Sequence, residues 1–136
     1  MKGYTHKVQY YETDKMGIVH HSNYIRWMEE ARVDFLESIG YSYDKLEQEG
    51  IISPVVAVNC KYKATTTFAD EIRILVKVKE FKGVKLVLEY EMRKVSDNSV
   101  VFMGTSEHCF VDGESKIVRL SKTHPDFCAV LSKLAE

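Results

Sequence analysis

Residues 22–39 of the chain read SNYIRWMEEARVDFLESI, and the apolar residues among them recur every three or four positions. This spacing places them on one face of an α-helix. The apolar face comprises Tyr24, Trp27, Met28, Ala31, Phe35, Leu36 and Ile39. Ser22 or Asn23 is expected to cap the start of the helix, and Gly40 is typical of the residue that ends one. We therefore predict a long helix with one apolar face.

Segments in which apolar and polar residues alternate lie on both sides of this helix. We expect one strand before it, over Tyr4–Tyr11, and four after it. The later strands cover Pro54–Tyr62, Glu71–Phe81, Val84–Arg93 and Ser99–Val111. Turn signals at Gly83 and at residues 96–98 join neighbouring strands into hairpins. Because the apolar helix needs a cover, we predict an α+β fold in which an antiparallel sheet curls around the central helix.

Three shorter elements complete the expected fold. Tyr43–Gln48 and Asp126–Leu134 should form short helices, and Lys116–Leu120 a short strand. The length of 136 residues fits one domain over residues 1–136, because no internal repeat or linker interrupts it.

Composition and charge exclude several classes of protein. The chain is 45% hydrophobic and 29% charged, which is typical of globular domains and argues against disorder. Its formal net charge of −1 gives no broad attraction for nucleic acid. No apolar run is long enough to cross a bilayer, and residues 1–10 lack the apolar core of a signal peptide. We therefore expect a cytoplasmic protein without a membrane span.

The cysteines and histidines give no sign of a metal centre. Cys60, Cys109 and Cys128 are odd in number, widely spaced and form no CxxC pair, which argues against a disulfide framework or a zinc site. We expect Cys60 and Cys109 to be buried free thiols, which suit a reducing compartment. His20 and His21 are adjacent, so they make a poor chelating pair. No metal centre is expected from these residues.

The densest group of reactive side chains lies where the first strand gives way to the helix. Asp14 lies there in a polar, turn-like segment, and Gly17 would allow this segment to approach a ligand closely. Amide N–H groups in the first turn of a helix have no intrahelical partner, so they can polarise a carbonyl group. A carboxylate opposite them would supply the base or nucleophile for acyl-transfer hydrolysis. On residue types alone, a local role for Asp14 as a cap is the commoner outcome.

Other polar side chains are weaker candidates. His108 is expected to be a packed or partly exposed imidazole in a strand, and Glu30 to form an ion pair or to face solvent. Ser106 and Cys109 could act as nucleophiles only with a histidine nearby, which the sequence does not establish.

The junction carries a motif. Residues 10–24, YYETDKMGIVHHSNY, followed by EEAR at 29–32, resemble the signature of the 4-hydroxybenzoyl-CoA thioesterase family. They are most similar to the branch of bacterial acyl-CoA thioesterases associated with the Tol-Pal system. Residues 61–63 and 68–72 resemble the family segment that follows the helix, so the resemblance covers most of the chain. It implies a hotdog fold and hydrolysis of acyl-CoA thioesters without a metal or bound cofactor.

The resemblance also implies roles for single residues. Asp14 matches the catalytic carboxylate, and His21 matches the residue whose backbone N–H polarises the thioester carbonyl and whose side chain helps to orient substrate or water. Asn23 and Tyr24 occupy matched positions with supporting roles in substrate binding. Glu29 matches the helix glutamate, which would contact the site or a neighbouring subunit.

The resemblance further implies a homodimer or homotetramer with active sites between subunits, where the pantetheine arm of CoA runs along the interface. One departure concerns substrate choice. Family members often carry a small residue or proline where this chain has Lys15 and Met16, so Met16 would narrow or reshape the acyl pocket.

Two other functions compete with thioester hydrolysis. A hydratase or dehydratase of the same fold would use a histidine with an Asp or Glu on a different arrangement of strand and helix. An acyl-CoA or acyl-carrier binding module would keep the fold without turnover. Within the hydrolase interpretation, Asp14 acts either as a base toward water or as a nucleophile that forms an anhydride.

Overall fold

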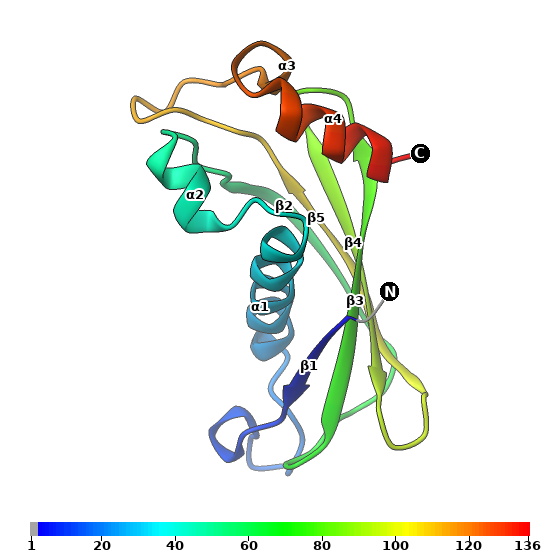
Figure 1. The fold of residues 1–136 in the computed structure, drawn as a ribbon. Coiled ribbons are helices and arrows are strands. Elements are labelled where there is room, and N and C mark those ends of the chain that lie inside the picture. The colour runs from blue at the N-terminus through cyan, green and yellow to red at the C-terminus, as the bar shows by residue number, and fades with distance from the viewer. Residues whose placement is uncertain (1–2) are drawn as a thin grey trace. The chain divides into compact units, whose positions relative to one another are not determined.

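The computed structural model describes residues 3–136, which form five strands and several helices (Figure 1). The strands are β1 (Tyr4–Lys7), β2 (Val55–Tyr62), β3 (Glu71–Phe81), β4 (Leu86–Lys94) and β5 (Val100–His108). The helices are the 3₁₀ helix η1 (Tyr10–Glu12), α1 (Ser22–Ser38), α2 (Tyr43–Gln48), α3 (Leu120–Thr123) and α4 (Pro125–Leu134). The predicted α+β class is confirmed.

The five strands form one antiparallel sheet in the order β1-β3-β4-β5-β2. β1 pairs with β3, so that Tyr4 lies opposite Ile74 and Lys7 lies opposite Glu71. Along β3, buried and exposed side chains alternate for most of its length, starting with exposed Glu71 and buried Ile72. One face of this strand therefore packs in the interior while the other faces solvent, as a period of two requires.

The edge strand β2 is exposed along almost its whole length. Its valines Val55, Val56 and Val58 are 44%, 60% and 41% exposed. An edge strand also presents unpaired backbone N–H and C=O groups, which another strand can pair with. The chain therefore carries an uncovered apolar edge.

The described chain divides into two compact units. The first runs to Phe35 and also includes Cys60–Val76 and Tyr90–Gly104. Within it, Tyr24 of α1 stacks on Phe102 of β5, with ring centroids 5.3 Å apart. The buried members of the predicted apolar helix face in this unit are Tyr24, Trp27, Met28, Ala31 and Phe35. The face predicted from the sequence is therefore the face that packs.

The second unit comprises Leu36–Asn59, Lys77–Glu89 and Thr105–Glu136. Aromatic rings form much of its core: Tyr41 stacks on Phe127 at 4.4 Å between centroids, and the Phe127 ring lies edge-on to another core phenylalanine at 5.8 Å. Burial of large rings supplies much of the stabilisation of such a core.

The C-terminal end of α1 has the predicted glycine. Gly40 adopts a left-handed φ of 92°, which glycine reaches without steric cost. Its N–H donates to the carbonyl of Glu37 at 3.0 Å, and the next N–H, of Tyr41, donates to Leu36 at 2.9 Å. This pair of bonds is the Schellman arrangement that ends many helices.

The start of α1 differs from the prediction. Ser22 and Asn23 both lie inside the helix, so neither is its cap. The imidazole of His20 takes this role, because its Nδ1 accepts a hydrogen bond from the Ser22 N–H at 3.2 Å. A histidine ring is not among the usual capping groups, so the sequence pattern missed it.

Two strand predictions are corrected. β1 ends at Lys7 rather than at Tyr11, because the Glu12 side chain accepts a hydrogen bond from the Gln9 N–H and turns the chain into η1. The predicted strand Lys116–Leu120 is absent from the described residues. An isolated bridge at Ile117 takes its place before α3.

The thiols are also less buried than expected. Cys60, Cys109 and Cys128 are free but only half-buried. Within residues 3–136, no helix combines the length and the apolar composition that crossing a membrane requires.

Candidate active site

A tight hairpin in the first unit carries Asp14. Thr13 and Val19 pair across it, the Asp14 N–H donates to the Ile18 carbonyl at 2.9 Å, and the Gly17 N–H donates back to the Asp14 carbonyl at 2.9 Å. Gly17 reaches a left-handed φ of 78° at the turn. We call residues 13–19 the Asp14 hairpin. Its geometry requires the glycine, because an L side chain would be strained at this φ.

The carboxylate of Asp14 is half-buried and only partly satisfied. Its Oδ1 accepts a hydrogen bond from the Met16 N–H at 2.8 Å. Among residues 3–136, its Oδ2 has no hydrogen-bond donor. The local bond is the turn-capping role expected from residue type alone. It leaves the second oxygen free to accept a proton or to attack a carbon atom.

The first turn of α1 follows the hairpin directly. The carbonyl of His20 accepts the Asn23 N–H at 3.0 Å, and the carbonyl of His21 accepts the Tyr24 N–H at 3.3 Å. The N–H of His21 itself has no acceptor among the described residues, and His21 is exposed. An unpartnered N–H at the positive end of a helix can donate to an oxyanion or a carbonyl oxygen.

The two strands of the Asp14 hairpin pair side by side, and Asp14 and His21 both lie within two residues of its base. The His20 N–H donates to the Glu12 carbonyl at 2.9 Å across the base of the hairpin. Asp14 lies two residues from this bond toward the hairpin tip, and His21 lies one residue from it toward α1. The two predicted catalytic residues therefore flank the hydrogen-bonded base of the hairpin.

The predicted supporting residues Asn23 and Tyr24 are 5% and 3% exposed. The Asn23 Nδ2 donates to the Glu12 carbonyl at 2.9 Å. The Tyr24 hydroxyl lies 2.8 Å from Thr66 Oγ1, and burial raises the pKa of Tyr24. Both side chains hold the surroundings of the hairpin in place. Glu29 is exposed and has no partner among the described residues.

Tyr62 is a neighbour of the site that sequence reasoning missed. Its hydroxyl donates to the His21 carbonyl at 3.3 Å, and its ring lies edge-on to the His21 ring with centroids 6.2 Å apart. Burial, together with a hydrogen bond to the Cys60 side chain, raises the pKa of Tyr62 to about 12. A period of two places Cys60 and Tyr62 on one face of β2, but no local signal connects that face with the start of α1.

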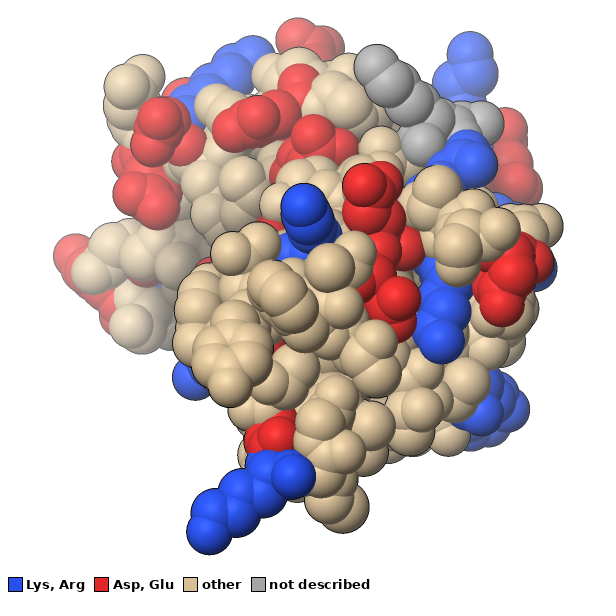
Figure 2. Space-filling view, turned by 90° about the horizontal axis from the view of Figure 1, so that it is seen from below, with Lys and Arg blue, Asp and Glu red and all other residues tan. Residues whose placement is uncertain are grey.

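An apolar surface surrounds the hairpin. Tyr10, Tyr11, Met16 and Phe68 are 76%, 80%, 76% and 56% exposed, and the rings of Tyr10 and Phe68 meet edge-on with centroids 5.7 Å apart. Figure 2 shows a broad uncharged area on the side of the molecule that carries η1. Large exposed apolar patches mark binding surfaces more often than inert ones.

A second pair of reactive side chains lies in the second unit. The Ser106 hydroxyl is 2.7 Å from His108 Nε2, so Ser106 does have the histidine that the sequence could not establish. Ser106 is 1% exposed and His108 0%. Of the two outcomes expected for His108, packed or partly exposed, the structure shows the packed one, and neither group is open to a substrate in this structure.

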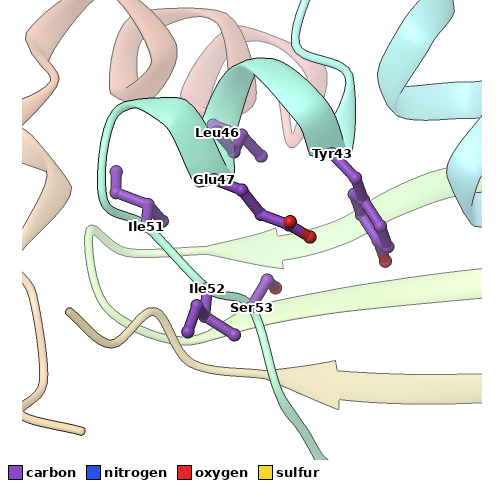
Figure 3. A pocket seen from close by; sticks show the side chains of 6 residues that line it. All are labelled: Tyr43, Leu46, Glu47, Ile51, Ile52 and Ser53. Carbon is purple, nitrogen blue, oxygen red and sulfur yellow. The ribbon is translucent and has the colours of Figure 1, made fainter. Parts of the chain in front are cut away.

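The second unit also has a small hollow of about 80 Å³ beside α2. Figure 3 shows the six side chains around it: Tyr43, Leu46, Glu47, Ile51, Ile52 and Ser53. None of the predicted site residues lines this hollow. Across residues 3–136, no group of three or more His, Cys, Asp and Glu side chains is placed to hold a metal ion.

Glu30 behaves as the sequence predicts. Its Oε1 lies 3.0 Å from His6 Nδ1 and accepts the Tyr4 hydroxyl at 2.7 Å. Burial and this hydrogen bond raise the pKa of Tyr4 to about 12.

Comparison with known proteins places the chain among thioesterases. The profile of the thioesterase-like superfamily matches residues 8–131. A Bacillus subtilis protein named as a candidate acyl-CoA thioesterase, YneP, is 34% identical over 128 residues, which covers 93% of this chain and 92% of the relative.

Solved structures agree with this placement. The DHNA-CoA thioesterase from Staphylococcus aureus superposes with a TM-score of 0.91 at 31% identity, over 96% of this chain and 87% of the other. A gentisyl-coenzyme A thioesterase has a TM-score of 0.82 at 29% identity, over 90% of this chain and 98% of the other. The predicted hotdog fold is thereby confirmed.

Proposed function

The chain belongs to the thioesterase-like superfamily, and on this premise we propose that it hydrolyses acyl-CoA thioesters to a free acid and CoA. The observation that carries the proposal is the Asp14 hairpin. One Asp14 carboxylate oxygen and the His21 N–H are both without partners among the described residues, and the two residues flank the Glu12–His20 hydrogen bond at the base of the hairpin. They are the two groups that acyl-transfer hydrolysis needs.

In the proposed reaction, the thioester carbonyl oxygen accepts a hydrogen bond from the His21 N–H. This bond stabilises the negative charge that the oxygen gains as the carbonyl carbon is attacked. Asp14 acts by one of two routes. As a base, it takes a proton from the attacking water; as a nucleophile, it bonds to the carbonyl carbon and water then cleaves the anhydride. In both routes the C–S bond breaks and the CoA thiolate leaves.

The exposed side chains beside the hairpin are suited to bind an apolar acyl group of the substrate. Tyr10, Tyr11 and Phe68 expose aromatic rings beside it, and Met16 follows Asp14 at the turn. Two of the solved relatives are named for DHNA-CoA and gentisyl-CoA. We therefore include aromatic acyl-CoA thioesters beside aliphatic ones as candidate substrates.

The active enzyme in this proposal is a homodimer or homotetramer with sites between subunits. The uncovered β2 edge supports it, because a second copy could pair with this strand and bury its valines. Glu29 is exposed on α1 and available to a neighbouring subunit. Sedimentation that showed only monomer at micromolar concentration would contradict the shared-site arrangement.

Three finer placements belong to the same proposal. The motif at residues 10–24 supports the Tol-Pal-associated branch of the 4-hydroxybenzoyl-CoA thioesterase family. Residues 1–136 act as one thioesterase domain. The three free thiols support a reducing, cytoplasmic compartment.

The test is hydrolysis of short, medium, long and aromatic acyl-CoAs by the wild-type protein and by Asp14→Asn. The variant keeps the shape of the side chain and removes the base or nucleophile, so turnover of every substrate should fall sharply. Asp14→Asn that works near the wild-type rate would show that Asp14 is not catalytic. Tight CoA binding without product from any thioester would instead indicate a binding module.

A labelling experiment can detect the nucleophile route. In a single turnover in ¹⁸O-labelled water, with enzyme in excess over substrate, water that cleaves the anhydride at its Asp14 carbonyl leaves label in the Asp14 carboxylate and passes an enzyme oxygen into the acid. The base route puts one water oxygen directly into the product acid and none into the protein. Mass spectrometry of the peptide that contains Asp14 reads the difference.

A further inference from the structure

The side chain of Glu12 is the most heavily bonded carboxylate at the base of the hairpin. It is 4% exposed, its Oε1 lies 2.8 Å from both the Gln9 N–H donor and His6 Nε2, and its Oε2 accepts the Trp27 Nε1–H at 2.7 Å. The three groups come from the strand end, β1 and α1. Burial by itself would raise the pKa of Glu12, but these hydrogen bonds outweigh it and lower the pKa. The buried carboxylate is therefore ionised and fully bonded.

The imidazole of His6 extends this cluster toward the surface. Its Nε2 faces Glu12 and its Nδ1 faces Glu30 at 3.0 Å, while its ring lies over Trp27 with centroids 4.7 Å apart. His6 is therefore held between two carboxylates and the Trp27 ring, and it fixes one side of the Glu12 carboxylate.

The main chain of Glu12 connects this cluster to the reacting groups. Its carbonyl accepts two hydrogen bonds, from the His20 N–H and from Asn23 Nδ2, both at 2.9 Å. One of these donors precedes His21 and the other lies in the first turn of α1. Two residues after Glu12 in the chain comes Asp14. The side chain of Glu12 is held by three hydrogen-bond partners, and its main chain is bonded to the segment that leads into α1. Glu12 therefore fixes the position of both strands at the base of the hairpin.

We propose that Glu12 is a positioning residue, which holds the Asp14 carboxylate and the His21 N–H at their working separation through its bonds to Trp27, His6 and the start of α1. The inference rests on the proposed function, because it gives Glu12 a role only if Asp14 and His21 act on a thioester. Displacement of a catalytic group by about 1 Å can cost roughly 100-fold in rate, so such a residue affects catalysis without touching the substrate.

The charge of Glu12 is the feature to remove. A carboxylate offers acceptors to all three donors, whereas glutamine of the same shape turns an NH₂ group toward at least one of them. We expect Glu12→Gln to lower kcat by about 10- to 100-fold while KM stays within about twofold, since substrate contacts are untouched. The matched control is Glu91→Gln. Glu91 pairs with Arg93 at 2.7 Å in the same unit, and we expect its variant to keep wild-type kcat.

A double variant separates positioning from general destabilisation. If Glu12 acts through Asp14, then Glu12→Gln should lower the residual rate of Asp14→Asn by less than about threefold, because the group it positions is already gone. Each rate is divided by the fraction of folded protein at the assay temperature, which thermal unfolding curves give. If Glu12→Gln does not fold, Trp27→Phe removes a single donor, and a kcat loss of about 3- to 10-fold with unchanged KM is expected.

The outcomes are distinct. Wild-type kcat per folded molecule in Glu12→Gln and Trp27→Phe overturns the positioning role, as does an equal loss of kcat in Glu91→Gln. A wild-type rate in Asp14→Asn overturns the proposed function itself, whatever Glu12→Gln does. Loss of activity in Asp14→Asn together with normal kcat in Glu12→Gln leaves the function in place and removes only the positioning role.

Discussion

The Asp14 hairpin and the Ser106–His108 pair are two places where reactive side chains meet, and they differ in access. In β5, the serine hydroxyl and the imidazole are 2.7 Å apart, the distance of a nucleophile and its base, yet both are sealed in the interior. In the hairpin, the carboxylate is half-buried and bonded on one side only.

The difference shows that proximity alone does not identify an active site. The Ser106 hydroxyl and the His108 imidazole, on alternate residues of β5, bond to each other in the interior, where no substrate reaches them. A catalytic pair must instead keep unsatisfied groups aimed at the place where a substrate can enter. Only the hairpin meets this condition, so it should control turnover, while the strand pair should control stability.

The largest expected effect is on turnover. Asp14→Ala should lower kcat for acyl-CoA by about 10²- to 10⁴-fold, the usual contribution of a general base. Ser106→Ala should keep kcat per folded molecule within about twofold. Steady-state assays of both variants on one substrate decide this. A loss in Ser106→Ala as deep as that in Asp14→Ala would reverse the assignment of the two regions.

Stability should respond in the opposite order. Ser106→Ala deletes a buried hydrogen bond to His108, and we expect the free energy of unfolding to fall by about 1–3 kcal/mol. Asp14→Asn changes a half-exposed side chain and should shift it by less than about 0.5 kcal/mol. Urea unfolding followed by circular dichroism measures both. Equal destabilisation by the two variants would show that the hairpin is also a structural element.

Glu12 sharpens the comparison, because it is sealed like Ser106 yet lies at the base of the hairpin. Since folding lowers its pKa, its contribution to stability is complete above the unfolded value of 4.5 and is lost as the pH falls through the lower folded value. One proton limits this loss to about 1.4 kcal/mol per pH unit. Unfolding free energies measured between pH 7 and pH 3 should therefore fall less steeply below about pH 4.5 in Glu12→Gln.

Two other groups contribute to the same acid loss. Hydrogen bonds within their turns lower the pKa values of Asp97 and Asp112, so part of the loss should persist in Glu12→Gln. An unchanged slope in Glu12→Gln would contradict an ionised, buried Glu12.

The smallest expected effect belongs to Tyr62. Its hydroxyl bonds to the His21 carbonyl at 3.3 Å, so Tyr62→Phe should lower kcat by about 2- to 10-fold, the equivalent of one ordinary hydrogen bond. Tyr41→Phe, in the core of the second unit, is the matched loss of a hydroxyl and should leave kcat unchanged. If both variants have the same kcat, Tyr62 does not help to hold the start of α1.

The sequence predicted the parts of this molecule that depend on neighbouring residues. The period of the apolar residues located α1 and its packed face, and the bounds of β3 agree with its predicted range. The motif around Asp14 predicted where the reactive groups gather. The structure places Asp14 in the hairpin and His21 two residues after its end, and their catalytic roles stay a prediction.

The parts that could not be predicted depend on contacts between distant residues. Tyr62 is 41 residues from His21, and Thr66 is 42 from Tyr24. Glu12 is only 15 residues from Trp27, but the sequence places it in a polar, turn-like segment, where a buried side chain is not expected. The spacing of apolar residues does not predict that a charged side chain is buried. Burial of Glu12 depends on hydrogen-bond donors from other elements of the fold.

The uncovered valines of β2 have a practical consequence for anyone who measures this enzyme. If two copies pair along that edge, the specific activity will depend on the protein concentration in the assay, because the subunits dissociate on dilution. Stock solutions and assay mixtures would then contain different molecules. Rates recorded at nanomolar protein would report the lone chain, and a lag after dilution would report how slowly the copies come apart.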